Sequence, residues 1–113
     1  MPTAAEVFEQ LRQAYALADA DAAAALYEPD AVYVEPDNSA HRGRDDIRNY
    51  LGRLFALRGP VEISVKRQVV ANGTVLAEWT TAFTENGRRS SGTPGVSVVE
   101  LGRGGISYHR DYQ

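Results

Sequence analysis

Two neighbouring stretches, VEISVKRQVVA at residues 61–71 and TVLAEWTTAFT at residues 74–84, decide the fold of this chain. At Val61 the spacing of apolar side chains changes from a helical period to a period of two. That is the period of a β-strand, whose successive side chains face opposite sides. Asn72-Gly73 separates the two stretches, and this dipeptide is the strongest short signal for a hairpin turn. Residues 61–84 therefore predict two long antiparallel strands.

Further strands are predicted after this hairpin. A second turn falls at residues 85–87, and the glycine- and proline-containing segment 90–95 suggests a bulge or bend before a strand at 96–101. The final stretch, Ile106–Gln113, alternates between two kinds of side chain. One face would carry Ile106, Tyr108, Arg110 and Tyr112, and the other would carry Ser107, His109, Asp111 and Gln113.

The residues before Val61 predict helices. Thr3 and Glu6 match a capping box, and apolar residues recur every three or four positions after them, which predicts a helix over 4–18. A second, short helix is expected from Ala22 to Tyr27, before Pro29. A strand over 30–36 precedes a third helix at about 44–56.

Three helices followed by an antiparallel meander indicate an α+β fold, with the helices packed on one face of a strongly curved, mostly antiparallel sheet. At 113 residues the chain forms one domain, residues 1–113, and such a sheet encloses a pocket. The other sheet face, expected to carry Val65, Leu76 and Val98, has no helix to cover it. We therefore expect a homodimer formed through the outer face of the sheet.

Composition excludes several classes of function. The formal net charge of −3 is unsuited to a nucleic-acid partner. There is no cysteine, and His41 and His109 lie in no ligand-spaced cluster, so we expect no metal and no cofactor. No stretch has the length of a membrane span or the pattern of a secretory signal, so we expect a cytoplasmic protein without a membrane partner.

Four segments carry a resemblance to a known family: LYEPDAV at residues 26–32, RGRDDI at 42–47, VEL to GI at 99–106, and YHRDY at 108–112. Together they resemble the SnoaL-like and ketosteroid-isomerase-like family of the nuclear transport factor 2 (NTF2-like) superfamily. The resemblance covers nearly the whole chain and implies a cystatin-like cone. It specifies the reaction weakly, because this fold hosts isomerases, cyclases, dehydratases, epoxide hydrolases and non-catalytic binders.

The resemblance to ketosteroid isomerases assigns roles to four positions. Glu35, which precedes Pro36, matches the catalytic carboxylate of those enzymes. Tyr27 matches a tyrosine that closes their second helix, and Tyr15 would correspond to the tyrosine that donates a hydrogen bond to the oxyanion. Ser97 stands where those enzymes carry a protonated aspartate, so that strong acid is absent here.

The last strand is also similar to limonene-epoxide-hydrolase-like proteins. Asp111 matches their catalytic aspartate in an aromatic-Arg-Asp-Tyr context, with His109 in the aromatic place. Those enzymes also carry an arginine and an aspartate two residues apart, and the matching positions hold Trp79 and Thr81. The resemblance thus implies an altered triad. SnoaL-type cyclases likewise use an aspartate on this strand, so Asp111 fits them better.

The residue types themselves suggest acid/base chemistry. Glu35, buried in an apolar cone, would suit proton abstraction beside a carbonyl; at an exposed strand end it would only pair with a residue such as Arg42. Asp111 and His109 emerge on the same strand face and could share a proton or a water, or could be structural. Four tyrosines could stabilise an oxyanion through their hydroxyls, or could be core aromatic residues with the hydroxyl at the edge of the core; they are Tyr15, Tyr27, Tyr33 and Tyr50. Trp79 is expected in the pocket wall.

Two functional hypotheses remain open at this point. The first is a cofactor-independent enzyme of the isomerase or cyclase type acting on a small, mostly apolar carbonyl or polyketide-like molecule. In it Glu35 and Asp111 move protons, His109 assists, and Tyr15, Tyr27 or Ser97 stabilises the oxyanion. The second is a binding or assembly domain that holds a small ligand in the same cavity without turnover. An epoxide-hydrolase-like enzyme with an altered triad is a further variant of the first.

Overall fold

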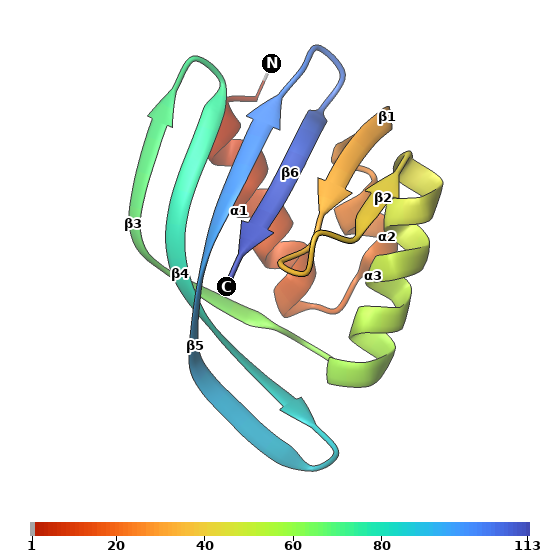
Figure 1. Cartoon of the computed structure of the whole chain (residues 1–113), viewed down its shortest axis with the longest axis vertical. Helices are drawn as coiled ribbons and strands as arrows, with labels where there is room; N and C mark the ends of the chain where they lie inside the picture. The colour runs from red at the N-terminus through yellow and green to blue at the C-terminus, as the bar shows by residue number, and fades with distance from the viewer. Residues whose placement is uncertain (1) are drawn as a thin grey trace.

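The order of helices and strands follows the change of period in the sequence (Figure 1). The structure is a computed structural model that describes residues 2–113. Its elements are α1 (Ala4–Ala16), α2 (Ala20–Ala24), β1 (Tyr27–Val34), β2 (Ala40–Arg42), α3 (Arg44–Arg58), β3 (Glu62–Ala71), β4 (Thr74–Glu85), β5 (Arg88–Leu101) and β6 (Ile106–Tyr112).

The six strands form one curved sheet in the order β2-β1-β6-β5-β4-β3. All neighbours are antiparallel except β1 and β6, which run parallel. The three helices lie on the concave side of this sheet (Figure 1). The predicted α+β class, with helices packed on a curved and mostly antiparallel sheet, is confirmed. Asn72-Gly73 forms the predicted tight turn, with φ angles of 53° and 76°.

The first helix begins as its capping box predicts. The Thr3 hydroxyl accepts a hydrogen bond from the Glu6 amide at 3.1 Å, and the Thr3 amide donates to the Glu6 carboxylate at 3.0 Å. The helix ends at Ala16 rather than at Ala18, because Ala18 has a φ of 52° and leaves the helical conformation. Its buried stripe, Ala4, Val7, Phe8, Leu11, Ala14 and Tyr15, faces the sheet.

The prediction that Tyr27 closes the second helix is wrong. That helix ends at Ala24, and Tyr27 opens β1 opposite Ile106 of β6. The β5–β6 turn approaches closely here, since the Ile106 amide donates to the Leu26 carbonyl at 2.8 Å. Gly105 makes this possible: its φ is 138°, and a Cβ there would lie 2.5 Å from that carbonyl oxygen. Pro29 is tolerated within β1 because the register with β6 shifts between Tyr27 and Val32.

Three other boundaries differ from the sequence prediction. The polar turn expected before Gly43 contains the short strand β2, which pairs with the end of β1. Residues 90–95 are not a break but part of the long strand β5, with a register shift opposite Thr81 and Ala82 that confirms the expected bulge. The third helix continues to Arg58 and ends at Gly59, whose φ is 64°.

Strict alternation also fails at two bulges. Ile106 is fully buried and faces the core like His109, because the β5–β6 register shifts between Glu100 and Leu101. Val65 packs against the core rather than lying on the outer face, since the β3–β4 register shifts between Val65 and Arg67. Each bulge adds one residue and so turns the following side chains to the other face.

The outer face of the sheet keeps an apolar row of side chains. Val69, Leu76 and Val98 lie side by side across β3, β4 and β5. Val69 is 61% exposed and Leu76 is 46% exposed. None of the helices described in residues 2–113 covers this row, as the sequence predicts for Leu76 and Val98 (Figure 1).

Candidate active site

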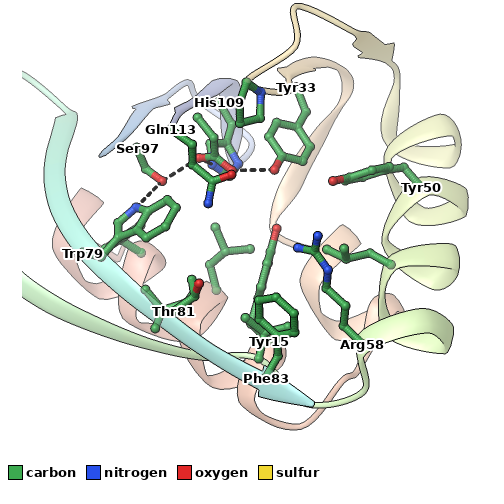
Figure 2. A pocket seen from close by; sticks show the side chains of 17 residues that line it. Tyr15, Tyr33, Tyr50, Arg58, Trp79, Thr81, Phe83, Ser97, His109 and Gln113 are labelled. Carbon is green, nitrogen blue, oxygen red and sulfur yellow. Dashed lines mark hydrogen bonds and ion pairs between the residues drawn. The ribbon is translucent and has the colours of Figure 1, made fainter. Parts of the chain in front are cut away.

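A cavity lies between the concave face of the sheet and the helices α1 and α3 (Figure 2). It contains about 660 Å³ of empty space, including its open mouth. Its walls are rich in aromatic rings: Phe8, Tyr15, Tyr33, Tyr50, Trp79 and Phe83. Its polar lining consists of Arg58, Thr81, Ser97, His109, Asp111 and Gln113.

Asp111 is the most strongly hydrogen-bonded side chain of this cavity. Its Oδ2 accepts a hydrogen bond from the Tyr33 hydroxyl at 2.6 Å. Its Oδ1 accepts from the Ser97 hydroxyl at 2.6 Å and from His109 Nε2 at 2.7 Å. A carboxylate has about four acceptor positions, so one on Oδ2 remains for a ligand. The three donors hold the carboxylate in one orientation toward the cavity.

Two buried side chains extend this network on either side. The Trp79 Nε1–H donates to the Ser97 oxygen at 2.8 Å, which directs the Ser97 proton toward Asp111. The Tyr27 oxygen lies 2.7 Å from His109 Nδ1. A neutral His109 with its proton on Nε2 satisfies both ring contacts, because it donates to Asp111 and accepts from Tyr27. We assign this tautomer from the hydrogen-bonding pattern.

The surroundings hold Asp111 in its ionised form. Burial pushes the pKa of Asp111 upward, but the charge of a protonated His109 and hydrogen bonds from His109, Ser97 and Tyr33 oppose it. The balance lowers the pKa of Asp111 below the ordinary value of 3.8. In the neutral tautomer the hydrogen bonds alone act in this direction. Asp111 is therefore a carboxylate at neutral pH.

Tyr15 presents a hydroxyl group without a partner. The side chain is 7% exposed, its hydroxyl has no hydrogen-bond partner among residues 2–113, and its ring packs edge-on against Phe55 with the ring centres 5.2 Å apart. Figure 2 shows this hydroxyl directed into the cavity. Burial, together with the charge of Asp111, raises the pKa of Tyr15 well above its ordinary value. A protonated, buried and unpaired phenol costs free energy until an acceptor arrives, so this group is ready to bind a ligand oxygen.

Tyr33 and Tyr50 join the two histidines in a set of stacked rings. Tyr33 stacks on His109 with ring centres 4.3 Å apart, and Tyr50 stacks on His41 at the same distance. Burial and then the Asp111 charge raise the pKa of Tyr33. For Tyr50 the causes are burial and the charge of Glu35. Both hydroxyls therefore remain protonated donors at neutral pH.

Glu35 lies beside the cavity rather than in its lining. It follows the last residue of β1, and its Oε2 is 2.7 Å from His41 Nε2. Its side chain is 22% exposed. Glu35 is therefore paired with His41 at the edge of the cavity, and not with Arg42. Its catalytic role stays a prediction, and in this structure Asp111 is the carboxylate that contacts the cavity.

The cavity brings together most of the residues that the sequence predicts for the site. Tyr15, Tyr33, Tyr50, Trp79, Ser97, His109 and Asp111 line it. Tyr27 does not; it is fully buried behind His109. Arg58 and His41 were missed, because the third helix was expected to end before Arg58 and His41 was expected in a polar turn. The one sequence feature that could have placed Arg58 at the end of the helix is its position just before Gly59-Pro60.

Within residues 2–113, no three histidine or acidic side chains are grouped so as to hold a metal ion. No helix of this part of the chain is long and apolar enough to cross a membrane.

The fold and this cavity define a class of protein, the α+β domains in which a curved sheet and the helices packed on it enclose a cavity. Within that class, residues 8–109 match the model of the SnoaL-like domain. The chain therefore belongs to the SnoaL-like domain family. A search of curated protein sequences finds no match.

Solved structures from several bacteria share this fold. A protein of ketosteroid isomerase-like fold from Catenulispora acidiphila DSM 44928, solved with trimethylamine, has a TM-score of 0.86 at 19% identity, with 96% of this chain and 85% of that chain covered. A candidate SnoaL-like polyketide cyclase from Shewanella denitrificans OS-217 has a TM-score of 0.84 at 13% identity, with coverages of 99% and 90%. At these identities the likeness shows the fold alone.

An LEH-like epoxide hydrolase from M. tuberculosis is more similar in sequence. It is 28% identical, with a TM-score of 0.84 and coverages of 96% of this chain and 80% of that chain. The predicted resemblance to SnoaL-like, nuclear transport factor 2-like and epoxide-hydrolase-like proteins is thus confirmed.

Proposed function

We propose that this protein is a cofactor-independent enzyme of the isomerase or cyclase type, which acts by general acid/base catalysis on a small, mostly apolar carbonyl compound. One observation carries the proposal: an ionised carboxylate, Asp111, and an unpaired phenol, Tyr15, line the same aromatic cavity. A proton acceptor and an oxyanion donor are the two groups that enolisation requires.

The reaction would begin with a proton transfer from carbon. Asp111 Oδ2 takes the proton next to the carbonyl group, and the electron pair of the C–H bond moves into the carbonyl, whose oxygen becomes an enolate. The Tyr15 hydroxyl donates a hydrogen bond to that oxygen. The aromatic walls keep water away, which strengthens this hydrogen bond as charge develops.

Two outcomes of the same enolate are consistent with this site. In an isomerase, Asp111 returns its proton to a different carbon of the conjugated system. In a cyclase, the enolate carbon attacks a second carbonyl carbon of the same molecule. A carbon–carbon bond forms, and the proton held by Asp111 passes to the new alkoxide.

Ser97, His109 and Tyr27 act as positioning residues in this scheme. Ser97 and His109 fix the carboxylate, and Tyr27 fixes the tautomer of His109. Because the pKa of Asp111 is lowered, the carboxylate is a weak base whose effectiveness comes from being always ionised and correctly placed.

Deuterium exchange tests the proposal without knowledge of the natural substrate. Benzylacetone, a small ketone that carries a phenyl ring, is incubated with the protein in deuterium oxide, and loss of its α-proton signals is followed by NMR. We expect catalysed exchange that Asp111→Asn slows by about 10²–10⁴-fold and Tyr15→Phe by a smaller factor. Glu35→Gln is the comparison, since Glu35 lies outside the lining. Exchange at the rate of buffer alone, or unaffected by Asp111→Asn, would contradict the proposal.

A binding protein without turnover is the second candidate. The observation that favours it is the number of donors on Asp111, because three hydrogen bonds also suit a carboxylate with a purely structural role. Saturable binding of aryl ketones together with an absence of exchange would identify this case. The cavity keeps Asp111 of the epoxide-hydrolase variant but not its two companions, because Trp79 and Thr81 line the positions where the resemblance implies an arginine and an aspartate.

A further inference from the structure

The cavity has opposite formal charges at its two ends. Of the described side chains that line it, those of Arg58 and Asp111 are charged at neutral pH. The Asp111 side chain is 15% exposed and the Arg58 side chain is 39% exposed, so Asp111 lies deep and Arg58 lies at the mouth. Of these two charges, that of Arg58 is the more accessible to a ligand that enters the cavity.

Arg58 has donor groups left for a ligand. It is the last residue of α3, and its Nε donates to the Glu85 carboxylate at 3.3 Å, a long hydrogen bond. Its guanidinium also lies over the Phe83 ring, 4.4 Å from the ring centre, which holds the planar group in place. A guanidinium carries five N–H donors, so the two terminal amino groups remain after the contact with Glu85.

Other donors gather near this guanidinium. Figure 2 shows the Arg58 guanidinium and the Tyr15 hydroxyl on the same side of the cavity, with the Tyr50 hydroxyl pointing in from α3. The Tyr15 hydroxyl has no partner in the protein. A guanidinium binds a carboxylate well, and the Tyr50 hydroxyl can add a further donor there, which leaves the Tyr15 hydroxyl for the carbonyl oxygen of the ligand.

From this geometry we propose that the ligand is an aryl or otherwise unsaturated carbonyl compound that bears a carboxylate, and that Arg58 selects it by binding that carboxylate at the mouth. This inference names the substrate class of the enzyme proposed above. The carboxylate stays near Arg58, because the deep end is occupied by the Asp111 charge. The carbonyl part of the molecule is thereby directed inward, toward Tyr15 and Asp111.

A binding experiment tests this inference independently of turnover. Trp79 is the one tryptophan of the chain and lines the cavity, so its fluorescence reports occupancy. Three unreactive probes of similar size carry a negative charge, no charge and a positive charge at their polar end: phenylacetate, phenylacetamide and phenethylammonium. We expect phenylacetate to bind about ten- to a hundredfold more tightly than phenylacetamide, and phenethylammonium to bind weakest. The preference should fall at high salt.

Two variants and one control separate ligand binding from a structural ion pair. Arg58→Gln should abolish the preference for phenylacetate. Glu85→Gln should increase it, because a competing carboxylate is removed from the same guanidinium. If Arg58 only paired with Glu85 for stability, the two variants would lower stability alike and leave the probe preference unchanged. Arg53→Gln, an exposed position of the same helix, is the matched control and should change nothing.

Each result bears on one proposal at a time. Arg58-dependent binding of phenylacetate without any deuterium exchange would support this inference and contradict the enzyme proposal. Catalysed exchange with no preference among the three probes, or a preference for phenethylammonium, would overturn this inference alone. The absence of saturable phenylacetate binding at millimolar concentration would also overturn it.

Discussion

At the scale of single residues, the chemistry of this protein depends on how Asp111 is hydrogen-bonded. The charge of a protonated His109, and then hydrogen bonds from His109, Ser97 and Tyr33, lower the pKa of its carboxyl despite its burial. The same donors are all neutral in the tautomer that satisfies Tyr27, so the cavity holds one net negative charge at its deep end. A ligand group placed there has to offer a proton or a hydrogen bond.

The lowered pKa of Asp111 gives a pH prediction with a definite sign. Because the folded-state pKa lies below the unfolded value of about 3.8, ionised Asp111 stabilises the fold above that pH, and this contribution disappears as the pH falls through the folded pKa. We expect deuterium exchange to be constant through neutral pH and to decline only in this acidic range. The exchange rate is measured as a function of pH. Thermal unfolding of the wild-type protein and of Asp111→Asn is compared over the same pH range. An inflection near about 6.5 would instead indicate that a histidine is the titrating group.

Removing the Tyr27 hydroxyl tests the positioning network. Tyr27→Phe leaves His109 Nδ1 buried without a partner, which we expect to cost about 1–3 kcal/mol of unfolding free energy. It should also lower the exchange rate and change the imidazole tautomer population, measured by nitrogen NMR of His109. Tyr108→Phe, on the outer face of the same strand that carries His109, is the control. A loss of stability without any change in tautomer or rate would show a purely structural Tyr27.

At the scale of elements, the long strand β5 depends on a glycine where it passes the cavity. A Cβ at Gly95 would lie 2.2 Å from the Trp79 ring, so no larger residue fits unless Trp79 moves. We expect Gly95→Ala to destabilise the fold by about 1–3 kcal/mol and to weaken the binding of cavity probes. Denaturant unfolding and Trp79 fluorescence measure the two effects.

Gly52 provides the opposite case for comparison. It lies inside α3, and a Cβ there would meet nothing within 4 Å. Gly52→Ala should stabilise the protein by about 0.5–1 kcal/mol through the higher helix propensity of alanine. Similar effects from both glycine substitutions would refute the steric explanation for Gly95.

The elements also show what the sequence could and could not predict. The Asn72-Gly73 hairpin and the Thr3 capping box are local, so each was readable from a few neighbouring residues. The bulges that turn Val65 and Ile106 inward result from pairing with distant strands, which no local period reveals. Strand β2 is only three residues long and carries no periodicity of its own.

The candidate site was predictable to a similar extent. Asp111 and His109 share a strand face, so their common direction followed from the alternation of β6. The position of Glu35 beside His41 depends on pairing between β1 and β2, and β2 was not predicted. Arg58 reaches the cavity because its helix is one half-turn longer than expected and because the β4–β5 hairpin brings Glu85 and Phe83 to it.

At the scale of the whole molecule, we propose that two copies pair through the outer face of the sheet. The row of Val69, Leu76 and Val98 is apolar and lies on the face opposite the helices, with Val69 and Leu76 exposed and Val98 half-buried. Burial of this row between two copies would remove it from water. Light scattering should then give twice the 12.3 kDa mass of one chain at micromolar concentration.

A charge in the middle of the row tests this assembly. Leu76→Lys should produce a monomer, because pairing would bury an uncompensated ammonium group. Leu17→Lys is the control, since Leu17 is 75% exposed and lies after α1, away from the outer face. A monomeric wild-type protein, or a Leu76→Lys variant that remains dimeric, would contradict the proposal.

The parallel pairing of β1 with β6 has a consequence for how the chain is synthesised. Strand β6 lies between β1 and β5, yet it is the last strand in the sequence. While the ribosome is still translating, β1 has no neighbour on that side, and its hydrogen-bonding edge stays open until residues 106–112 emerge. The same residues deliver His109 and Asp111, so the sheet closes and the cavity acquires its acid/base groups in a single late event. Nascent chains should therefore remain open to chaperones, and without ligand-binding capacity, until that event.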